Sequence, residues 1–277
     1  MKSFIAGLAA LTLFGCNESR NKSIELMNSG VAKFHNRLFE SAERDLQAAI
    51  QTDPSNVLAH YNLGKVYEEQ HKWTEASDEF ARAVTGDDSN ANYHYDLGNA
   101  YQQSGKLDLA EKELLAAIKL DDKRYKAYYR LGVVYEAQDK PKQADDMYRK
   151  AISINPRFAI AFTQLGFLYL NNDYIKEAEQ VFQNATVAND RDGDSWYGLG
   201  LARKEVGNFD GAIEALKKAV EFGAQSPDLK YNLALAYHAK GDDANAKTTL
   251  QQFVMSAGSK AGPDLVKAAN DLLYTLP

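Results

Sequence analysis

Residues 91–124 read ANYHYDLGNAYQQSGKLDLAEKELLAAIKLDDKR and hold two apolar segments at helical spacing. Gly105 separates the segments near the middle of the stretch, and glycine readily takes the left-handed conformation that ends a helix. We therefore expect two helices joined by a tight turn. One small residue in each segment, Gly98 or Ala110, marks where the helices come close, because a side chain larger than a methyl group would push them apart.

The same pattern recurs every 34 residues without an insertion. An alanine follows twelve residues after the small residue in all seven units, a leucine precedes it in six, and a tyrosine follows it by three in five. The small residue itself stands at Gly30, Gly64, Gly98, Gly132, Gly166, Gly200 and Ala234. The seven units cover residues 23–56, 57–90, 91–124, 125–158, 159–192, 193–226 and 227–260.

This spacing resembles the tetratricopeptide repeat (TPR), whose pattern W-x2-L-G-x2-Y, A-x3-F and P returns with a period of 34. The resemblance implies an all-α fold, a right-handed superhelical solenoid of seven TPR helical hairpins whose first helices line a concave groove. Stacking also has a physical reason, because one hairpin cannot bury its own apolar face. Pro54 and Pro156 are expected to end the second helix of their units, and Asp88, Asp122 and Asp190 take that place elsewhere.

Residues 261–277 follow the repeat domain of residues 23–260 and are predicted to form a C-terminal capping helix from Pro263 onward. Its apolar residues share one side, which would cover the face that the last hairpin leaves open. A second interpretation stays open, in which the chain associates with itself through Leu272, Leu273 and Leu276.

The first residues have the features of a bacterial export signal. Lys2 supplies a positive charge, and residues 4–14 form an apolar run of 11 residues that is too short to span a bilayer. Residues 13–16 (LFGC) resemble a lipobox, the sequence at which lipoprotein signal peptidase cleaves. The resemblance implies a signal peptide over residues 1–15 and acyl chains on Cys16, the single cysteine. The alternatives are an ordinary secretory signal or a buried first helix.

Residues 16–22 are predicted to be the lipidated cysteine and a short polar tether, which reaches about 20 Å when extended. Asn17 follows the cysteine, whereas an aspartate at this place favours the inner membrane in the lipoproteins that this segment resembles. We therefore expect a protein of the bacterial cell envelope, lipid-anchored to the outer membrane and facing the periplasm. A mature domain without cysteine suits that oxidising compartment.

In related repeats, the second, fifth, ninth and twelfth positions of each unit face the groove. Tyrosine holds the fifth position in five of the seven units, where it offers a large contact area and a hydroxyl at low entropy cost. It is also the common packing residue there, so both interpretations stay open. The predicted partner-groove residues are Tyr61, Lys65, Tyr95, Asn99, Lys126, Tyr129, Arg130, Val133, Phe167, Tyr197, Leu201, Tyr231 and Leu235.

The ninth position changes from polar to apolar along the chain. We hypothesise that a partner segment docks its apolar anchors around Phe167, Leu201 and Leu235, with its polar end toward Lys65. The alternative is that these apolar side chains pack between neighbouring first helices.

Lys126 and Arg130 stand one helical turn apart and match the last pair of a motif with which family members clamp a C-terminal carboxylate. Asp96 stands where that motif has asparagine, and its charge would repel such a ligand. We therefore interpret Lys126 and Arg130 as solvated charges of the groove.

Composition and motifs argue against catalysis and against nucleic-acid binding. The net charge is −6, and no run of basic residues is present that could bind phosphates. The sequence lacks the HExxH and GxSxG motifs and a phosphate-binding glycine loop. His60 and His94 take a large packing position and are interpreted as structural. We expect no enzyme activity, cofactor, metal or small-molecule substrate.

Two classes of function remain. The protein is expected to bind a protein or peptide partner while its acyl chains hold it to the membrane. A lipobox followed by tandem repeats resembles the pilotin lipoproteins of type IV pilus systems, which help secretins assemble in the outer membrane. The alternative is an adaptor that recruits an envelope protease or a cell-wall hydrolase.

Overall fold

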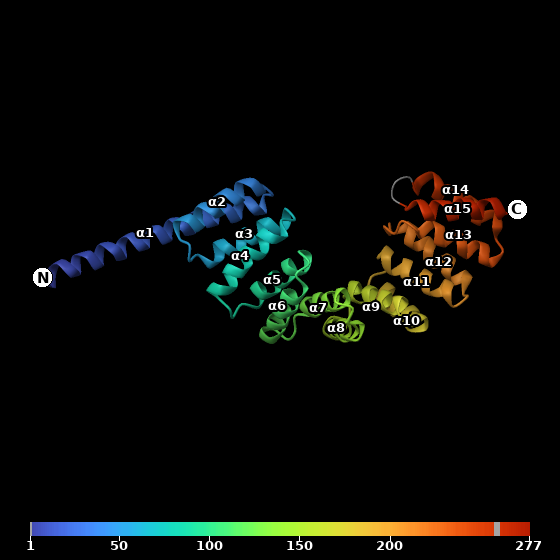
Figure 1. The fold of residues 1–277 in the computed structure, drawn as a ribbon, viewed down its shortest axis with the longest axis horizontal. Helices are drawn as coiled ribbons and strands as arrows, with labels where there is room; N and C mark the ends of the chain where they lie inside the picture. Colours follow the sequence, from blue (N-terminus) through green and yellow to red (C-terminus); the bar gives the residue numbers. More distant parts are fainter. Residues whose placement is uncertain (1, 258–260) are drawn as a thin grey trace. The chain divides into compact units, whose positions relative to one another are not determined.

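The computed structural model describes the backbone of residues 2–257 and 261–277 and the side chains of residues 17–256 and 261–277. The side chains of the predicted signal peptide and of Cys16 lie outside the described residues. Helices joined by short turns make up the described chain (Figure 1). They are α1 (Lys2–His35), α2 (Phe39–Thr52), α3 (Val57–Glu69), α4 (Trp73–Gly86), α5 (Ala91–Gln103), α6 (Leu107–Leu120), α7 (Tyr125–Ala137), α8 (Pro141–Ile154), α9 (Ala159–Asn171), α10 (Ile175–Ala188), α11 (Gly193–Glu205), α12 (Phe209–Glu221), α13 (Leu229–Lys240), α14 (Asp243–Ala257) and α15 (Pro263–Thr275).

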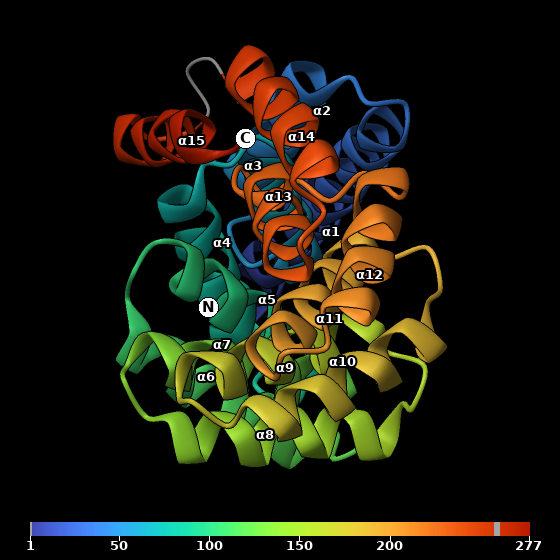
Figure 2. The ribbon, with the colours of Figure 1, turned by 90° about the vertical axis from the view of Figure 1, so that its right-hand side faces the viewer.

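The helices divide into two compact units, residues 1–140 and residues 141–277. In the first unit α1 packs against α2, α3 against α4 and α5 against α6, and each pair also contacts the next helix. In the second unit the pairs are α9 with α10, α11 with α12 and α13 with α14. Figure 2 shows α11–α12 and α13–α14 stacked in chain order. The prediction of an all-α fold made of helical hairpins is confirmed.

Each hairpin turns at a residue in the left-handed backbone conformation. Gly105 has a φ of 76°, as its place between two apolar segments predicts. The equivalent residues one or more periods away, all with positive φ, are Arg37, His71, Asp139, Asp173, Gly207 and Gly241.

The two helices of a hairpin approach most closely at the glycine of the first helix. A methyl group added to Gly98 would lie 2.8 Å from Leu114 Cγ, and one added to Gly64 would lie 2.6 Å from the Phe80 ring. The close approach agrees with the sequence, and the side chain that lies against the glycine is a large one of the second helix. A glycine leaves room above the backbone that a branched or aromatic side chain can fill.

The segment predicted to be a polar tether continues α1. Residues 17–22 are helical turns of α1. The Ser19 hydroxyl donates to the Thr52 carbonyl (3.0 Å), and the Ser23 hydroxyl donates to the Ala49 carbonyl (2.8 Å). These bonds join the early turns of α1 to the end of α2, so the chain gains tertiary contacts by staying helical.

At the other end, α15 packs against α14 and closes the second unit. Ala269 and Leu276 are buried in a cluster with Phe253, and Leu272 and Leu273 are partly buried against the same cluster. The leucines that could join two copies of the chain therefore contribute to packing within one copy.

Candidate partner-binding groove

The predicted groove residues lie on the first helices of the hairpins. Those of the first unit belong to α3, α5 and α7, and those of the second unit belong to α9, α11 and α13. Lys126 is exposed, Asn99 and Tyr197 are buried, and the others are half-buried. Most of these side chains therefore contact the protein itself on one side and solvent on the other.

Tyr61 is joined to the next hairpin by its hydroxyl and by its ring. The hydroxyl donates to Asp96 Oδ2 (2.7 Å), and the ring lies against Tyr93 with centroids 4.7 Å apart. Burial, followed by the charge of Asp96, raises the pKa of Tyr61 well above its ordinary value. Tyr95 instead lies under the Arg124 guanidinium, which is 5.5 Å from its ring centroid.

The tyrosines of the second unit also link neighbouring hairpins. The Tyr197 hydroxyl donates to Asp228 Oδ1 (2.7 Å) and accepts from Asn232 Nδ2 (3.3 Å), and burial raises its pKa. The Tyr231 ring packs near Phe253, with centroids 5.9 Å apart. The tyrosines therefore have a packing role in both units, while their contact with a partner stays a prediction.

Lys65 and Asn99 belong to a charged network between α3 and α5. The Lys65 ammonium bonds Glu68 and lies 3.7 Å from Asp96 Oδ1, and Asn99 Nδ2 donates to Glu68 Oε1 (3.0 Å). Burial raises the pKa of the Asp96 carboxyl, although Lys65 and the Tyr61 hydroxyl act in the opposite direction. Burial also acts to lower the pKa of Lys65, but the charges of Asp96 and Glu68 outweigh it and leave that pKa raised. Two carboxylates share one ammonium, so the network is acidic.

Lys126 and Arg130 match part of a motif that binds a carboxylate, and the negative charge of this network is unfavourable for such a ligand. Arg130 Nη1 donates to Gln102 Oε1 (3.4 Å), and its guanidinium lies 5.8 Å from the Tyr129 ring centroid. A C-terminal carboxylate would be repelled by Asp96, as the sequence predicts.

Sequence reasoning missed Glu68, Gln102 and Arg124, which bond or cover the predicted groove residues. Glu68 and Gln102 occupy the twelfth position of their repeats, one of the groove-facing positions, so the repeat alignment itself could have identified them.

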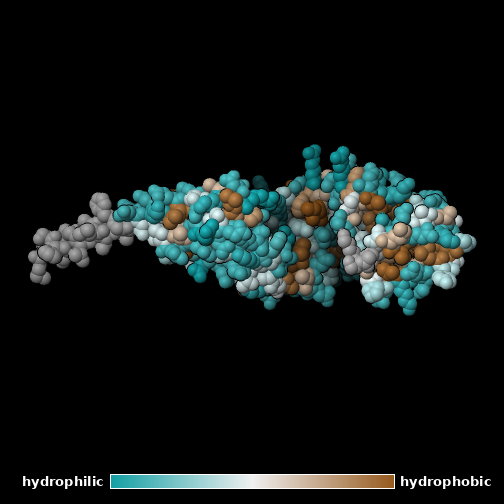
Figure 3. All heavy atoms as spheres, turned by 90° about the horizontal axis from the view of Figure 1, so that it is seen from above, coloured by the Kyte–Doolittle hydropathy of each residue, from teal (hydrophilic) through white to brown (hydrophobic). Residues whose placement is uncertain are grey.

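The apolar groove residues of the second unit pack against their neighbours. The Phe167 ring lies edge-on to Phe182 (5.0 Å between centroids) and 6.5 Å from Tyr197. Leu201 packs against a buried cluster that includes Leu216. These contacts support the interpretation that the side chains pack between helices, yet each stays partly exposed. On the face drawn in Figure 3 the second unit carries more apolar surface than the first.

Neither a metal centre nor a membrane span is found in the part of the chain that the structure describes. Among those residues, no three His, Cys, Asp or Glu side chains come together to hold a metal ion, and no helix is long and apolar enough to cross a bilayer. His60 Nδ1 lies 2.5 Å from Glu79 Oε2, and His94 Nδ1 lies 2.7 Å from Glu113 Oε2. Each histidine therefore joins the two helices of its own hairpin.

Family models match most of the repeat region. The model of the cilia and flagella-associated protein 70 C-terminal domain, a TPR domain, matches residues 85–270, and a TPR repeat model matches residues 39–71. No curated protein sequence matches the chain significantly.

MamA, PilF and PilW are among the solved structures that share the fold. MamA is 30% identical over 58% of this chain and 94% of its own, with a TM-score of 0.56. PilF of Pseudomonas aeruginosa is 20% identical over 79% of this chain and 98% of its own, with a TM-score of 0.65. PilW, described as a widely conserved type IV pilus biogenesis factor, is 17% identical over 76% of this chain and 98% of its own, with a TM-score of 0.66. At such identities, PilF and PilW show a common fold alone.

Proposed function

This chain belongs to the TPR family of the cilia and flagella-associated protein 70 C-terminal domain, and we propose that it is a membrane-anchored interaction scaffold of the bacterial envelope. TPR domains bind protein or peptide partners and are typically non-catalytic. The observation that carries the proposal is the lipobox-like stretch LFGC at residues 13–16, which six residues separate from the first repeat.

The helical conformation of residues 17–22 bears on how such an anchor would work. At a rise of about 1.5 Å per residue these six residues span about 9 Å, less than half the length of an extended tether. Acyl chains on Cys16 would therefore hold the first hairpin close to the membrane surface. The side chains of residues 17–22 are mostly exposed and polar, which suits a position beside lipid headgroups.

Replacing the anchor residue tests the lipoprotein assignment. Wild type is expected to incorporate labelled palmitate and to enter the detergent phase of a Triton X-114 separation, because two or more acyl chains make anchoring stable. Cys16→Ser should do neither. Asn17→Asp serves as the matched variant, since it should keep the label and move the protein to the inner membrane. Palmitate on Cys16→Ser would contradict the assignment.

Within the envelope, the proposed role is that of a pilotin-like assembly factor for an outer-membrane secretin of a type IV pilus. The order of lipobox and repeats supports this role, and so does the fold shared with PilF and PilW. The partner segment is proposed to lie in the groove, with apolar anchors on the first helices of the second unit.

Capture from detergent-solubilised envelopes tests the partner and the groove together. Wild type is expected to retain a secretin subunit, and Leu201→Ala/Leu235→Ala should lose it, with affinity falling about 30-fold if the pair contributes about 2 kcal/mol. Val187→Ala/Met255→Ala is the matched control, because these side chains are 83% and 87% exposed and lie outside the groove set.

Two other outcomes of the capture would contradict a part of the proposal. A protease or cell-wall hydrolase retained in place of the secretin would replace the pilotin role with that of an adaptor. Equal retention by the groove variant and by its control would place binding outside the groove.

A further inference from the structure

In the first unit, lysine side chains lie against tyrosine rings beside the turns of successive hairpins. In the second hairpin, Lys72 Nζ lies 5.3 Å from the centroid of the Tyr67 ring and 3.3 Å from Glu43 Oε2. The ammonium therefore meets an aromatic face on the first helix of its own hairpin and a carboxylate on α2, in the preceding hairpin. Lys72 is the residue immediately before α4.

A lysine lies over a tyrosine ring twice more along this unit, and Lys140 again has a carboxylate of the preceding hairpin. Lys140 Nζ lies 5.4 Å from the Tyr135 ring centroid and 3.4 Å from Glu111 Oε2. Lys106 Nζ lies 5.6 Å from the Tyr101 ring centroid. Three successive repeats therefore place a lysine of their own over the tyrosine that follows the small residue by three.

The fifth hairpin keeps the tyrosine and the carboxylate but lacks the lysine. The Tyr169 hydroxyl donates to the Asp145 carboxylate on α8. Tyr174 stands in the place of Lys72, immediately before the second helix, and its φ and ψ of −85° and 60° are close to the −84° and 71° of Lys72. The backbone is therefore nearly the same at Lys72 and at Tyr174, and only the side chain differs. In the fifth hairpin no lysine of this repeat reaches the position that the ammonium takes in the earlier hairpins.

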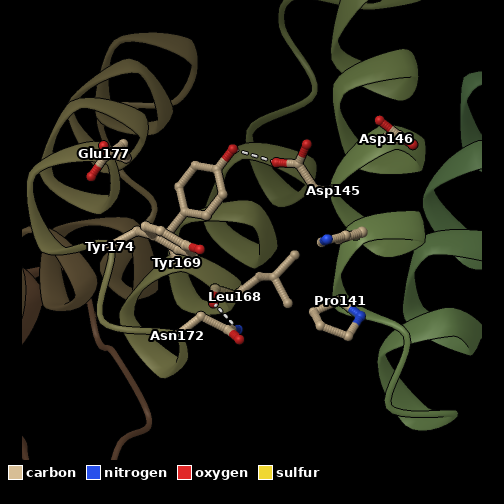
Figure 4. A pocket seen from close by; sticks show the side chains of 9 residues that line it. Pro141, Asp145, Asp146, Leu168, Tyr169, Asn172, Tyr174 and Glu177 are labelled. Atoms are coloured by element: carbon tan, nitrogen blue, oxygen red, sulfur yellow. Dashed lines mark hydrogen bonds between the residues drawn. The ribbon is translucent and has the colours of Figure 1, made fainter.

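A pocket of about 600 Å³ opens at this place, between α8 and the turn that joins α9 to α10 (Figure 4). The rings of Tyr169 and Tyr174 form part of its wall, with centroids 6.1 Å apart and planes at 76°. Tyr174 is 57% exposed, so the pocket is open to solvent. The charged residues of the wall are the three carboxylates Asp145, Asp146 and Glu177 and one lysine, Lys142.

Arg149 contacts the same tyrosine and the same carboxylate. Its Nε donates to the Asp145 carboxylate (2.9 and 3.0 Å), its Nη2 bonds the Tyr169 hydroxyl, and its guanidinium carbon lies 5.7 Å from that ring centroid. The residue one helical turn after the carboxylate in the first hairpin is Gln47, whose Nε2 donates to the Tyr67 hydroxyl (3.0 Å). A lysine still lies over that tyrosine ring, so the two approaches are compatible, and Arg149 corresponds to Gln47.

We propose that this pocket binds the lysine side chain of a partner protein, whose ammonium takes the position that Lys72, Lys106 and Lys140 fill in the earlier hairpins. The aromatic walls favour a cation, and so do the three carboxylates, which outnumber the cations Lys142 and Arg149 by one. Pro141 and Leu168 line the pocket as well and offer apolar surface to the alkyl stem. The inference rests on the proposed function in that the chain binds a protein, and it adds a contact outside the predicted groove.

The test uses the full chain with 13C-labelled tyrosine rings and N-acetyl-lysine-methylamide as the probe. Titration is expected to shift the Tyr169 and Tyr174 signals in a saturable way. The norleucine analogue, which has a similar stem without the charge, should leave them in place. Equal shifts with the norleucine analogue, or no saturable shift with the lysine probe, would overturn the proposal.

Two variants distinguish this pocket from general attraction to an acidic surface. Tyr174→Lys supplies the missing ammonium from within the chain and is expected to weaken probe binding at least about tenfold without loss of helix content, because lysine holds this place in three other hairpins. Lys142→Gln removes the one cation of the wall and should tighten binding. Unchanged binding by Tyr174→Lys, or weaker binding by Lys142→Gln, would overturn the proposal. Leu201→Ala/Leu235→Ala should bind the probe normally, so failure of the groove would not be mistaken for failure of the pocket.

Discussion

Phe182→Ala is expected to lower the free energy of unfolding by about 3–5 kcal/mol. Phe182 is fully buried on α10, and its ring fills space left by two glycines. A methyl group added to Gly166 would lie 2.7 Å from this ring, and one added to Gly198 would lie 2.1 Å from it. Neither glycine has a side chain that could move into the cavity left by alanine, so the cost should lie toward the upper part of the range.

Urea denaturation of wild type and variant measures this loss. Val187→Ala on the same helix is the control, because its side chain is 83% exposed and its change should stay within about 0.5 kcal/mol. Stacked repeats can unfold in parts, so hydrogen exchange of the α9–α12 amides should localise the effect. If Phe182→Ala lost no more stability than the control, the ring would not be needed to fill the space beside the two glycines.

Lys65→Met is expected to cost about 3 kcal/mol, because it leaves the buried Asp96 and the half-buried Glu68 without their ammonium. The Lys65 side chain is 29% exposed, so the expected cost is at the lower end of what a fully buried ion pair would give. Asp96→Asn should cost only about 1 kcal/mol, since Lys65 and Glu68 then balance each other. The double variant Lys65→Met/Asp96→Asn should recover part of the loss.

The pH dependence gives an independent check on Lys65→Met. Burial already raises the pKa of Asp96, and removing the lysine should raise it further. The native state then holds more protons than the unfolded state, so the variant loses stability as the pH rises through that pKa and regains it as the pH falls. Denaturation at neutral and mildly acidic pH should show the gap to wild type narrowing in acid. A gap that does not change with pH would contradict the assigned network.

The candidate site was predictable only in part. The repeat register placed Tyr61, Lys65 and Phe167 on the first helices of their hairpins, which is where the structure has them. It did not reveal that the Tyr61 hydroxyl and the Lys65 ammonium are both bonded to α5 through Asp96. Such bonds depend on the distance between one hairpin and the next, and the repeat period of the sequence does not predict that distance.

The sequence by itself determined the hairpins, their turns and their period. These features depend on residues a few positions apart, such as Gly105 in its left-handed turn, and local backbone preferences are sufficient to produce them. Only the tertiary structure decided that residues 17–22 continue α1, that the chain divides into two units and that a pocket opens beside Tyr174. The helical start of α1 is bonded to residues 26 and 33 positions away, and the pocket tyrosine Tyr169 is bonded to a residue 24 positions away. Local backbone preferences do not specify contacts over such separations.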